Sequence, residues 1–211
     1  MPVADLFRQI LAETQPRLII TAGTAGATFG KTQLGDVMVT RAARFRLSDE
    51  FESAPFNGRT YACTWMKKIP SAFFGKAKPL LDAHRDKLSD SGPVSRTPRL
   101  WVEGRRTASW LDFKPFAPIL TTDFFEFGTT TNHLDRIGCG VEMGDAVLGM
   151  VIDELPQKPR WLVIRNASDP RIDGHLSKKE QVDEAVQTYQ KYGYWTSVNS
   201  SIATWAVIAA D

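Results

Sequence analysis

The chain has 211 residues, 43% of them hydrophobic and 24% charged, a length and composition typical of one globular domain with a substantial core. Its 26 Lys and Arg residues and 24 Asp and Glu residues leave a formal net charge of +2, so charge gives no reason to expect a nucleic-acid partner. The two cysteines, Cys63 and Cys139, are far apart and form no C-x-x-C pair, which argues against a disulfide framework and predicts a cytoplasmic location.

Neither end of the sequence predicts a membrane segment. Residues 1–10 contain no basic stretch followed by an apolar run, so they do not indicate a secretory signal. The apolar run at 201–210 is too short to cross a bilayer. We therefore expect no membrane partner.

The histidines give no metal-ligand spacing, because His84, His133 and His175 are widely separated in the sequence. We therefore expect no metal.

The first half of the chain predicts a helix followed by two strands. Asp5 can cap a helix that ends before Pro16. Helical spacing places four apolar residues on one face of it: Leu6, Phe7, Ile10 and Leu11. Residues 17–22 form an apolar run typical of a buried strand, residues 23–36 a turn rich in glycine and threonine, and residues 37–45 a second strand. The helix-breaking and turn residues in 46–98 predict an irregular excursion with one helix near 80–88.

In the second half, strands alternate with helices. We expect strands at 99–104, 117–122 and 161–169, an aromatic loop at 123–132, a short apolar segment at 140–143, and helical spacing from Met143 to Leu155. Ser177 and Glu180 have the spacing of a capping box and start a helix over 178–192, and the apolar segment 194–210 predicts a second, largely buried helix. This order of elements predicts an α/β domain with a mainly parallel or mixed sheet.

Residues 25–32, AGATFGKT, resemble a relaxed phosphate-binding P-loop, and residues 150–154 could supply the carboxylate of a magnesium site. A P-loop requires a helix that begins at its Lys-Thr pair, because the helix N-terminus provides amides for the phosphate. Here Lys31 and Thr32 are followed by a turn and a β-branched run. A P-loop nucleotidase is therefore the less favoured alternative.

Three segments form a more coherent pattern. Gly23-Thr24-Ala25-Gly26 is followed by Leu34-Gly35-Asp36, then come Val141-Glu142-Met143, and finally Arg165 with Ser168-Asp169. In this order they resemble the nucleoside phosphorylase and nucleosidase superfamily, whose members carry G-[ST]-x-G, V-E-M-E and R-x-x-S-D. The resemblance extends over residues 6–210 and is weak through 46–98.

The resemblance implies one domain over residues 1–211, a three-layer α/β/α sandwich with a central mixed, mostly parallel sheet. It further implies cleavage of the N-ribosyl bond of a small-molecule nucleoside, with purines preferred, and a homo-oligomer. No cofactor is expected; phosphate is the co-substrate if the reaction is phosphorolysis rather than hydrolysis.

The resemblance also assigns the site residues. They are Asp169 with Ser168 as the acid toward the base, Phe125 as the stacking platform, Glu142, Met143 and Asp145 at the nucleoside, and Gly23, Thr24 and Gly26 at the phosphate or water site. Cleaving the bond builds positive charge on the sugar and negative charge on the base, so an acid near the base lowers the barrier. An Asp acts as an acid near neutral pH only if its pKa is raised, which burial at a strand end can do.

Each assignment has a plainer structural alternative. Asp169 and Pro170 fit an ordinary turn, and the glycines fit turn geometry. Phe125 and Met143 fit core packing, and Asp145 fits a helix N-terminus, where a carboxylate is favoured by the dipole.

Two departures from the family pattern, at Gly144 and at the start of the sequence, keep a second function open, and a third, Thr21, favours water over phosphate as the nucleophile. Gly144 stands where the family has the second Glu of V-E-M-E, and Thr21 stands where purine phosphorylases carry an Arg that grips phosphate. The sequence opens with a helix where the family has N-terminal strands with a glycine-rich loop and an acidic residue that activates water. The alternative is a catalytically impaired nucleoside-binding module of the same fold.

Overall fold

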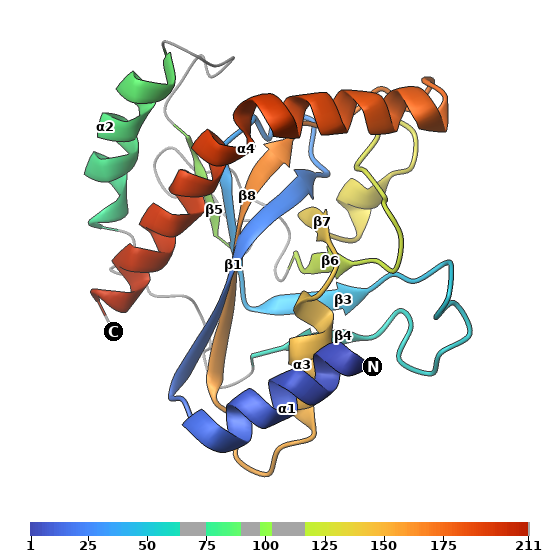
Figure 1. Ribbon diagram of the computed structural model, residues 1–211, viewed down its shortest axis with the longest axis vertical. Coiled ribbons are helices and arrows are strands. Elements are labelled where there is room, and N and C mark those ends of the chain that lie inside the picture. The colour runs from blue at the N-terminus through green and yellow to red at the C-terminus, as the bar shows by residue number, and fades with distance from the viewer. Residues whose placement is uncertain (64–74, 90–97, 103–116, 211) are drawn as a thin grey trace.

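The described residues fold around one mixed sheet of eight strands in the order β4-β3-β6-β7-β1-β8-β2-β5 (Figure 1). The structure is a computed structural model that describes residues 1–63, 75–89, 98–102 and 117–210. The strands are β1 (Leu18–Ala27), β2 (Val37–Thr40), β3 (Ala42–Phe45), β4 (Thr60–Ala62), β5 (Leu100–Val102), β6 (Ile119–Thr121), β7 (Gly140–Glu142) and β8 (Arg160–Asp169). Four of the seven pairings among them are parallel.

Helices flank this sheet in two groups. They are α1 (Pro2–Thr14), α2 (Ala77–Ser89), α3 (Asp145–Asp153) and α4 (Lys178–Ile208), with a short 3-10 turn at Leu134–Arg136. Helix α4 packs against β8 and β1 with α2 beside it, while α3 packs against β3 and β6 with α1 beside it. Figure 1 shows the two groups on separate parts of the sheet. The prediction of an α/β/α sandwich around a mixed, mostly parallel sheet is confirmed.

The two long strands β1 and β8 form the centre of the sheet. They pair in parallel from Leu18 with Arg160 to Ala25 with Ala167, and a bulge then brings Gly26 opposite Asp169. On its other side β1 pairs with β7 only through Gly26 and Ala27. Among the described strands, none pairs with the preceding part of β1 on that side, so within the described part of the chain most of this edge has no strand partner.

The core lies between the sheet and the helices and is filled by large apolar side chains. Trp161, Phe45 and Met38 are among the largest fully buried side chains. Residues 161–164 are fully buried, as an uninterrupted apolar run in a covered strand predicts. None of the described helices combines the length and the apolar character that crossing a membrane requires.

The structure corrects the predicted turn at 23–36. Residues 23–27 continue β1, so the segment Gly23-Thr24-Ala25-Gly26 is strand rather than turn. Neither Gly23 nor Gly26 has a positive φ; of the glycines in this region only Gly35 does, at +80°. The turn begins later, at Thr28, and leads into β2.

Three further predictions need correction. The expected strand 37–45 divides at Arg41 into β2 and β3, which pair with different neighbours. The two helices predicted after Ser177 are one 31-residue helix, α4, which changes direction partway along (Figure 1). On α1, Leu11 is buried as expected, but Leu6 and Ile10 are exposed. The face of α1 that packs against the rest of the protein is therefore narrower than the apolar face that the sequence predicts.

Several boundaries agree closely with the sequence. The capping box is present, with Ser177 Oγ accepting from Glu180 N at 3.3 Å and Glu180 Oε2 accepting from Ser177 N at 2.8 Å. The helix expected near 80–88 is α2, and the excursion also contains β4. Residues 64–74 and 90–97 of the excursion, and residues 103–104 of the expected strand 99–104, lie outside the described part of the chain.

Candidate active site

The three sequence segments of the predicted site meet at the end of β1. Gly26 lies between Asp169 of β8 and Val141 of β7, and Glu142 in turn pairs with Thr121 of β6. Strand β7 then leads directly into α3 at Asp145. Sheet pairing therefore brings together residues that are more than a hundred positions apart in the sequence.

Asp169 is a buried carboxyl group with one unpartnered oxygen. Ser168 Oγ donates to Oδ1 at 2.8 Å, whereas Oδ2 is buried and accepts no hydrogen bond from the described residues. Burial raises the pKa of Asp169 to about 6, against the opposing effect of the Ser168 hydrogen bond. The group can thus hold a proton at mildly acidic pH and release it near neutrality.

The same carboxyl group packs against the backbone of β1. A Cβ added at Gly26 would lie 2.7 Å from Asp169 Oδ2, a distance that real Cβ atoms do not show. The glycine is needed here for space rather than for its backbone freedom.

Glu142 caps the N-terminus of α3. Its carboxylate accepts from Gly144 N at 2.6 Å and from Asp145 N at 2.9 Å, and it also accepts from the Thr121 hydroxyl. Thr121 Oγ1 in turn accepts from Ala146 N at 2.8 Å. Burial and the adjacent Asp145 charge raise the pKa of Glu142, while Arg165 and these hydrogen bonds oppose the rise.

Arg165 balances this buried negative charge. Its Nε and Nη2 donate to the two carboxylate oxygens of Asp145 at 2.8 and 2.5 Å, and Nη2 lies 3.4 Å from Glu142 Oε2. The guanidinium lies over Gly23, where an added Cβ would be 2.5 Å from Nη1. Asp145 is only 1% exposed and is fully engaged by Arg165. The sequence alone assigned no role to Arg165. A charged residue inside an otherwise apolar strand is the signal that could have identified it as a partner of buried carboxylates.

The remaining predicted residues are more accessible. Phe125 is 72% exposed, and its ring centroid lies 6.1 Å from that of the buried Phe127. Met143 is 56% exposed. Thr24 is half-buried and pairs with Asn166 in the β1–β8 ladder. None of these three side chains is part of the buried core.

The segment that resembles a P-loop lacks the helix that such a loop needs. Residues 30–36 form turns, with Thr32 N donating to Phe29 O and Asp36 N to Gln33 O, and β2 follows directly. Among the described residues there is no group of three His, Cys, Asp or Glu side chains that could hold a metal.

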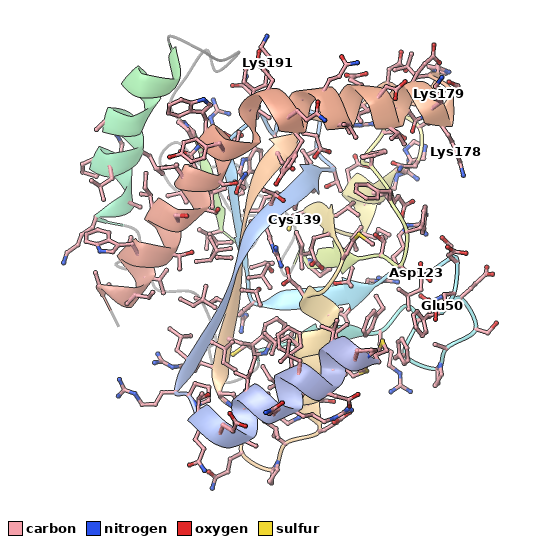
Figure 2. All side chains as sticks on the ribbon, in the orientation of Figure 1. Glu50, Asp123, Cys139, Lys178, Lys179 and Lys191 are labelled. Carbon is pink, nitrogen blue, oxygen red and sulfur yellow. The ribbon has the colours of Figure 1, made fainter. Side chains whose placement is uncertain are left out.

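Cys139 offers no nucleophile. Cys139 lies buried near the middle of the molecule (Figure 2), and burial raises the pKa of its thiol to about 12. A thiol with that pKa is protonated and inert at neutral pH.

No protein-family model matches the sequence, and no curated protein matches it. Solved structures match its fold. A 5′-methylthioadenosine/S-adenosylhomocysteine nucleosidase from Colwellia psychrerythraea, in complex with adenine, has a TM-score of 0.60 at 18% identity over 99% of this chain and 73% of its own. The corresponding Neisseria meningitidis nucleosidase, in complex with methylthio-immucillin-A, has a TM-score of 0.58 at 14% identity over 98% and 75%.

A third structure, the futalosine hydrolase of Helicobacter pylori, has a TM-score of 0.58 at 11% identity over 98% of this chain and 74% of its own. At these identities the likeness concerns the fold. The chain has the nucleoside phosphorylase/nucleosidase-like fold.

Proposed function

We propose that the protein binds a purine nucleoside and cleaves its N-ribosyl bond, with Asp169 as the acid toward the departing base. The observation that carries this proposal is the Asp169 carboxyl group, which is buried, has a pKa raised to about 6 and keeps Oδ2 without a partner among the described residues. An acid with a pKa near the working pH is well suited to proton transfer.

In this reaction the bond between the base nitrogen and C1′ breaks, and its electron pair leaves with the base. Asp169 gives its proton to the base, which departs neutral, and the positive charge left on the ribose is captured by the oxygen of water or of phosphate. Water loses a proton to the solvent as the new bond to C1′ forms. We assign the site of this nucleophile to Thr24 with Gly23 and Gly26, beside Asp169 at the end of β1.

Phe125 and Met143 supply the apolar contacts. An exposed phenylalanine can stack on a purine, since stacking needs only a planar face, and an exposed methionine can lie against the ribose. Glu142 and Asp145 contribute to nucleoside binding indirectly. Their hydrogen bonds hold the start of α3, and with it Met143, in place.

The structural neighbours support the proposal. The Colwellia psychrerythraea structure contains adenine and the Neisseria meningitidis structure contains methylthio-immucillin-A, and both proteins are nucleosidases. A chain with the same fold and a buried acid at a strand end is consistent with that chemistry.

A nucleoside-binding module without catalysis is the second candidate. Gly144 replaces a carboxylate of the family motif, and the next carboxylate, Asp145, is bound through both oxygens by Arg165. Neither position then offers a free acceptor pair for the ribose hydroxyls.

Titration with adenosine, inosine and methylthioadenosine, with and without phosphate, followed by assay for released base, separates these candidates. Base release that is lost in Asp169→Asn and kept in Asp183→Asn, an exposed position on α4, is the expected result. Dependence of release on phosphate identifies phosphorolysis. Binding without release would favour the binding module, and no binding would refute both.

A further inference from the structure

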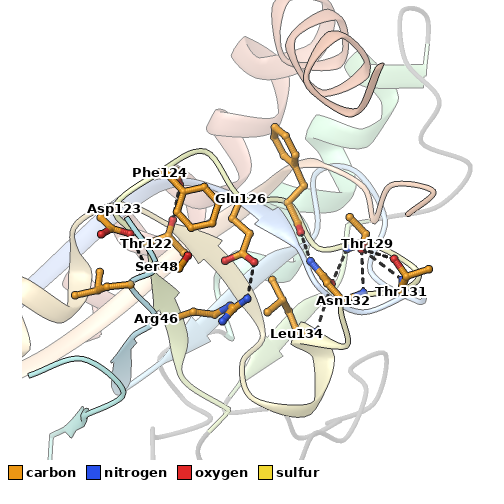
Figure 3. Close-up of polar contacts among 12 residues, drawn as sticks. Arg46, Ser48, Thr122, Asp123, Phe124, Glu126, Thr129, Thr131, Asn132 and Leu134 are labelled. Atoms are coloured by element: carbon orange, nitrogen blue, oxygen red, sulfur yellow. Dashed lines mark hydrogen bonds and ion pairs between the residues drawn. The ribbon is translucent and has the colours of Figure 1, made fainter. Parts of the chain in front are cut away.

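The loop that carries Phe125 is fixed to the 46–51 segment at two points (Figure 3). At the first, the Asp123 carboxylate accepts hydrogen bonds from the backbone N–H groups of Ser48, Asp49 and Phe51 at 3.1, 3.2 and 2.9 Å. Burial alone would raise the pKa of Asp123, but these backbone hydrogen bonds outweigh it and hold the pKa below its usual value. The carboxylate is therefore ionised at neutral pH.

The second point is an ion pair on the other side of Phe125. Arg46 Nη2 donates to Glu126 Oε1 at 2.8 Å, and the Glu126 side chain is only 10% exposed. Charge-assisted hydrogen bonds of this kind are stronger than neutral ones, more so where one partner is buried. Residues 123 and 126 are thus both held by the same segment, and Phe125 lies between them.

The 46–51 segment is itself firmly attached to the core. Asn57 accepts from Leu47 N at 2.9 Å and donates to Leu47 O at 2.9 Å. The Phe51 and Phe45 rings pack on Phe56, with centroids 6.2 and 4.9 Å away. Phe45 is a core residue of β3, so this segment offers a fixed support.

Phe125 needs such support because its own side chain makes little contact with the protein. It is 72% exposed, so packing does not determine where the ring lies. A loop that is ordered before the ligand arrives loses less conformational entropy on binding than a flexible one.

We propose that Arg46, Asp123 and Glu126 are positioning residues that hold Phe125 ready for stacking on the base. This inference rests on the proposed function, in which Phe125 contacts the nucleoside. It assigns a role in the site to the 46–51 segment, which in the sequence belongs to an irregular excursion.

The test uses Arg46→Met, Arg46→Lys and Asp123→Asn in the full chain. Arg8→Met is the matched control, because it removes an Arg–Glu ion pair, with Glu154 at 2.9 Å, between α1 and the end of α3. Two quantities are measured for each variant: hydrogen–deuterium exchange of the Phe124–Phe127 amides without ligand, and nucleoside affinity alongside the kcat of base release.

We expect faster exchange across Phe124–Phe127 and about tenfold weaker nucleoside binding in Arg46→Met and Asp123→Asn, with kcat little changed. Arg46→Lys keeps the charge and should recover part of the affinity. Arg8→Met should change neither exchange nor binding. A general loss of stability would instead speed exchange throughout the chain and lower kcat as well.

Unchanged exchange and unchanged affinity in both Arg46→Met and Asp123→Asn would overturn the inference. If either variant does not fold, the other decides the question. A wild-type protein that binds no nucleoside would refute the proposed function, and the exchange measurement would then still decide whether these residues order the loop.

Discussion

The carboxylate of Asp169 lies directly against the Cα of Gly26, where a Cβ would be 2.7 Å from Oδ2. The bulge between Ala25 and Gly26 brings the two residues opposite each other at the end of the central strand pair. The absence of a side chain on one strand therefore makes room for the buried acid of the other.

Replacing Gly26 with alanine should displace Asp169. We expect Gly26→Ala to cost about 1–3 kcal/mol of stability, as overpacking typically does, and to reduce base release more strongly than its effect on stability explains. Urea unfolding and the base-release assay measure both. Gly30→Ala is the control, because its Cβ would meet only the end of the Arg171 side chain at 3.4 Å. Equal effects of the two substitutions would contradict the explanation.

Asp169 should also make stability depend on pH. Its pKa is raised from 3.8 to about 6, so the folded state binds the proton more tightly than the unfolded chain does. Stability from this group is then complete below about pH 4, falls as pH rises to about 6 and is absent above that range. Relative to wild type, Asp169→Asn should gain on the order of 2 kcal/mol between pH 4 and pH 8. A stability difference that is constant across this range would count against a raised pKa.

The buried pair of Arg165 and Asp145 should show strong coupling. Arg165→Met leaves two buried carboxylates, Asp145 and Glu142, without their cation, and should destabilise the fold by about 3–5 kcal/mol. Adding Asp145→Asn should restore part of that loss, because it removes one of the uncompensated charges. Chemical denaturation of the wild type, both single variants and the double variant measures the coupling. Strictly additive effects would show that the pair does not act as a unit.

The sequence predicted those helices and strands whose formation depends on residues close together in the chain. The capping box starts α4 at Lys178, and the uninterrupted apolar run after Arg160 forms the covered strand β8. The prediction that the first strand ends before Gly23 was wrong for a different reason. Glycine signals a turn in a local reading, whereas Gly23 and Gly26 lie within β1, where the side chains of Arg165 and Asp169 pack over them from a strand far along the sequence.

Long-range contacts also explain what the sequence did not indicate about the site. The three motif segments gave the residues around the end of β1, since their order in the chain matched a known pattern. The anchoring of the Phe125 loop depends on Arg46 and Glu126, which are 80 positions apart. No local spacing relates them, so only the folded chain shows the pair.

The side of β1 on which residues 18–25 have no partner among the described strands predicts uneven protection in the centre of the sheet. Alternate amides of a strand point to opposite sides, so about half of those in residues 18–25 face away from β8. These amides should exchange much faster than the amides of Val163–Asn166, which lie between β1 and β2. Residue-resolved exchange by NMR checks this. Slow exchange of every β1 amide would mean that this side is covered.

The same edge should promote self-association at high protein concentration. Residues 18–24 contain no charge, no proline and no bulge, which are the usual means of blocking an edge, and Ala22 is exposed. Ala22→Lys should therefore slow association measured by light scattering while changing stability by less than about 0.5 kcal/mol. Ala12→Lys adds the same charge at an exposed position of α1, away from the strand. If it slows association equally, the effect comes from net charge rather than from the edge; if only Ala22→Lys does so, unpaired strand backbone drives the association.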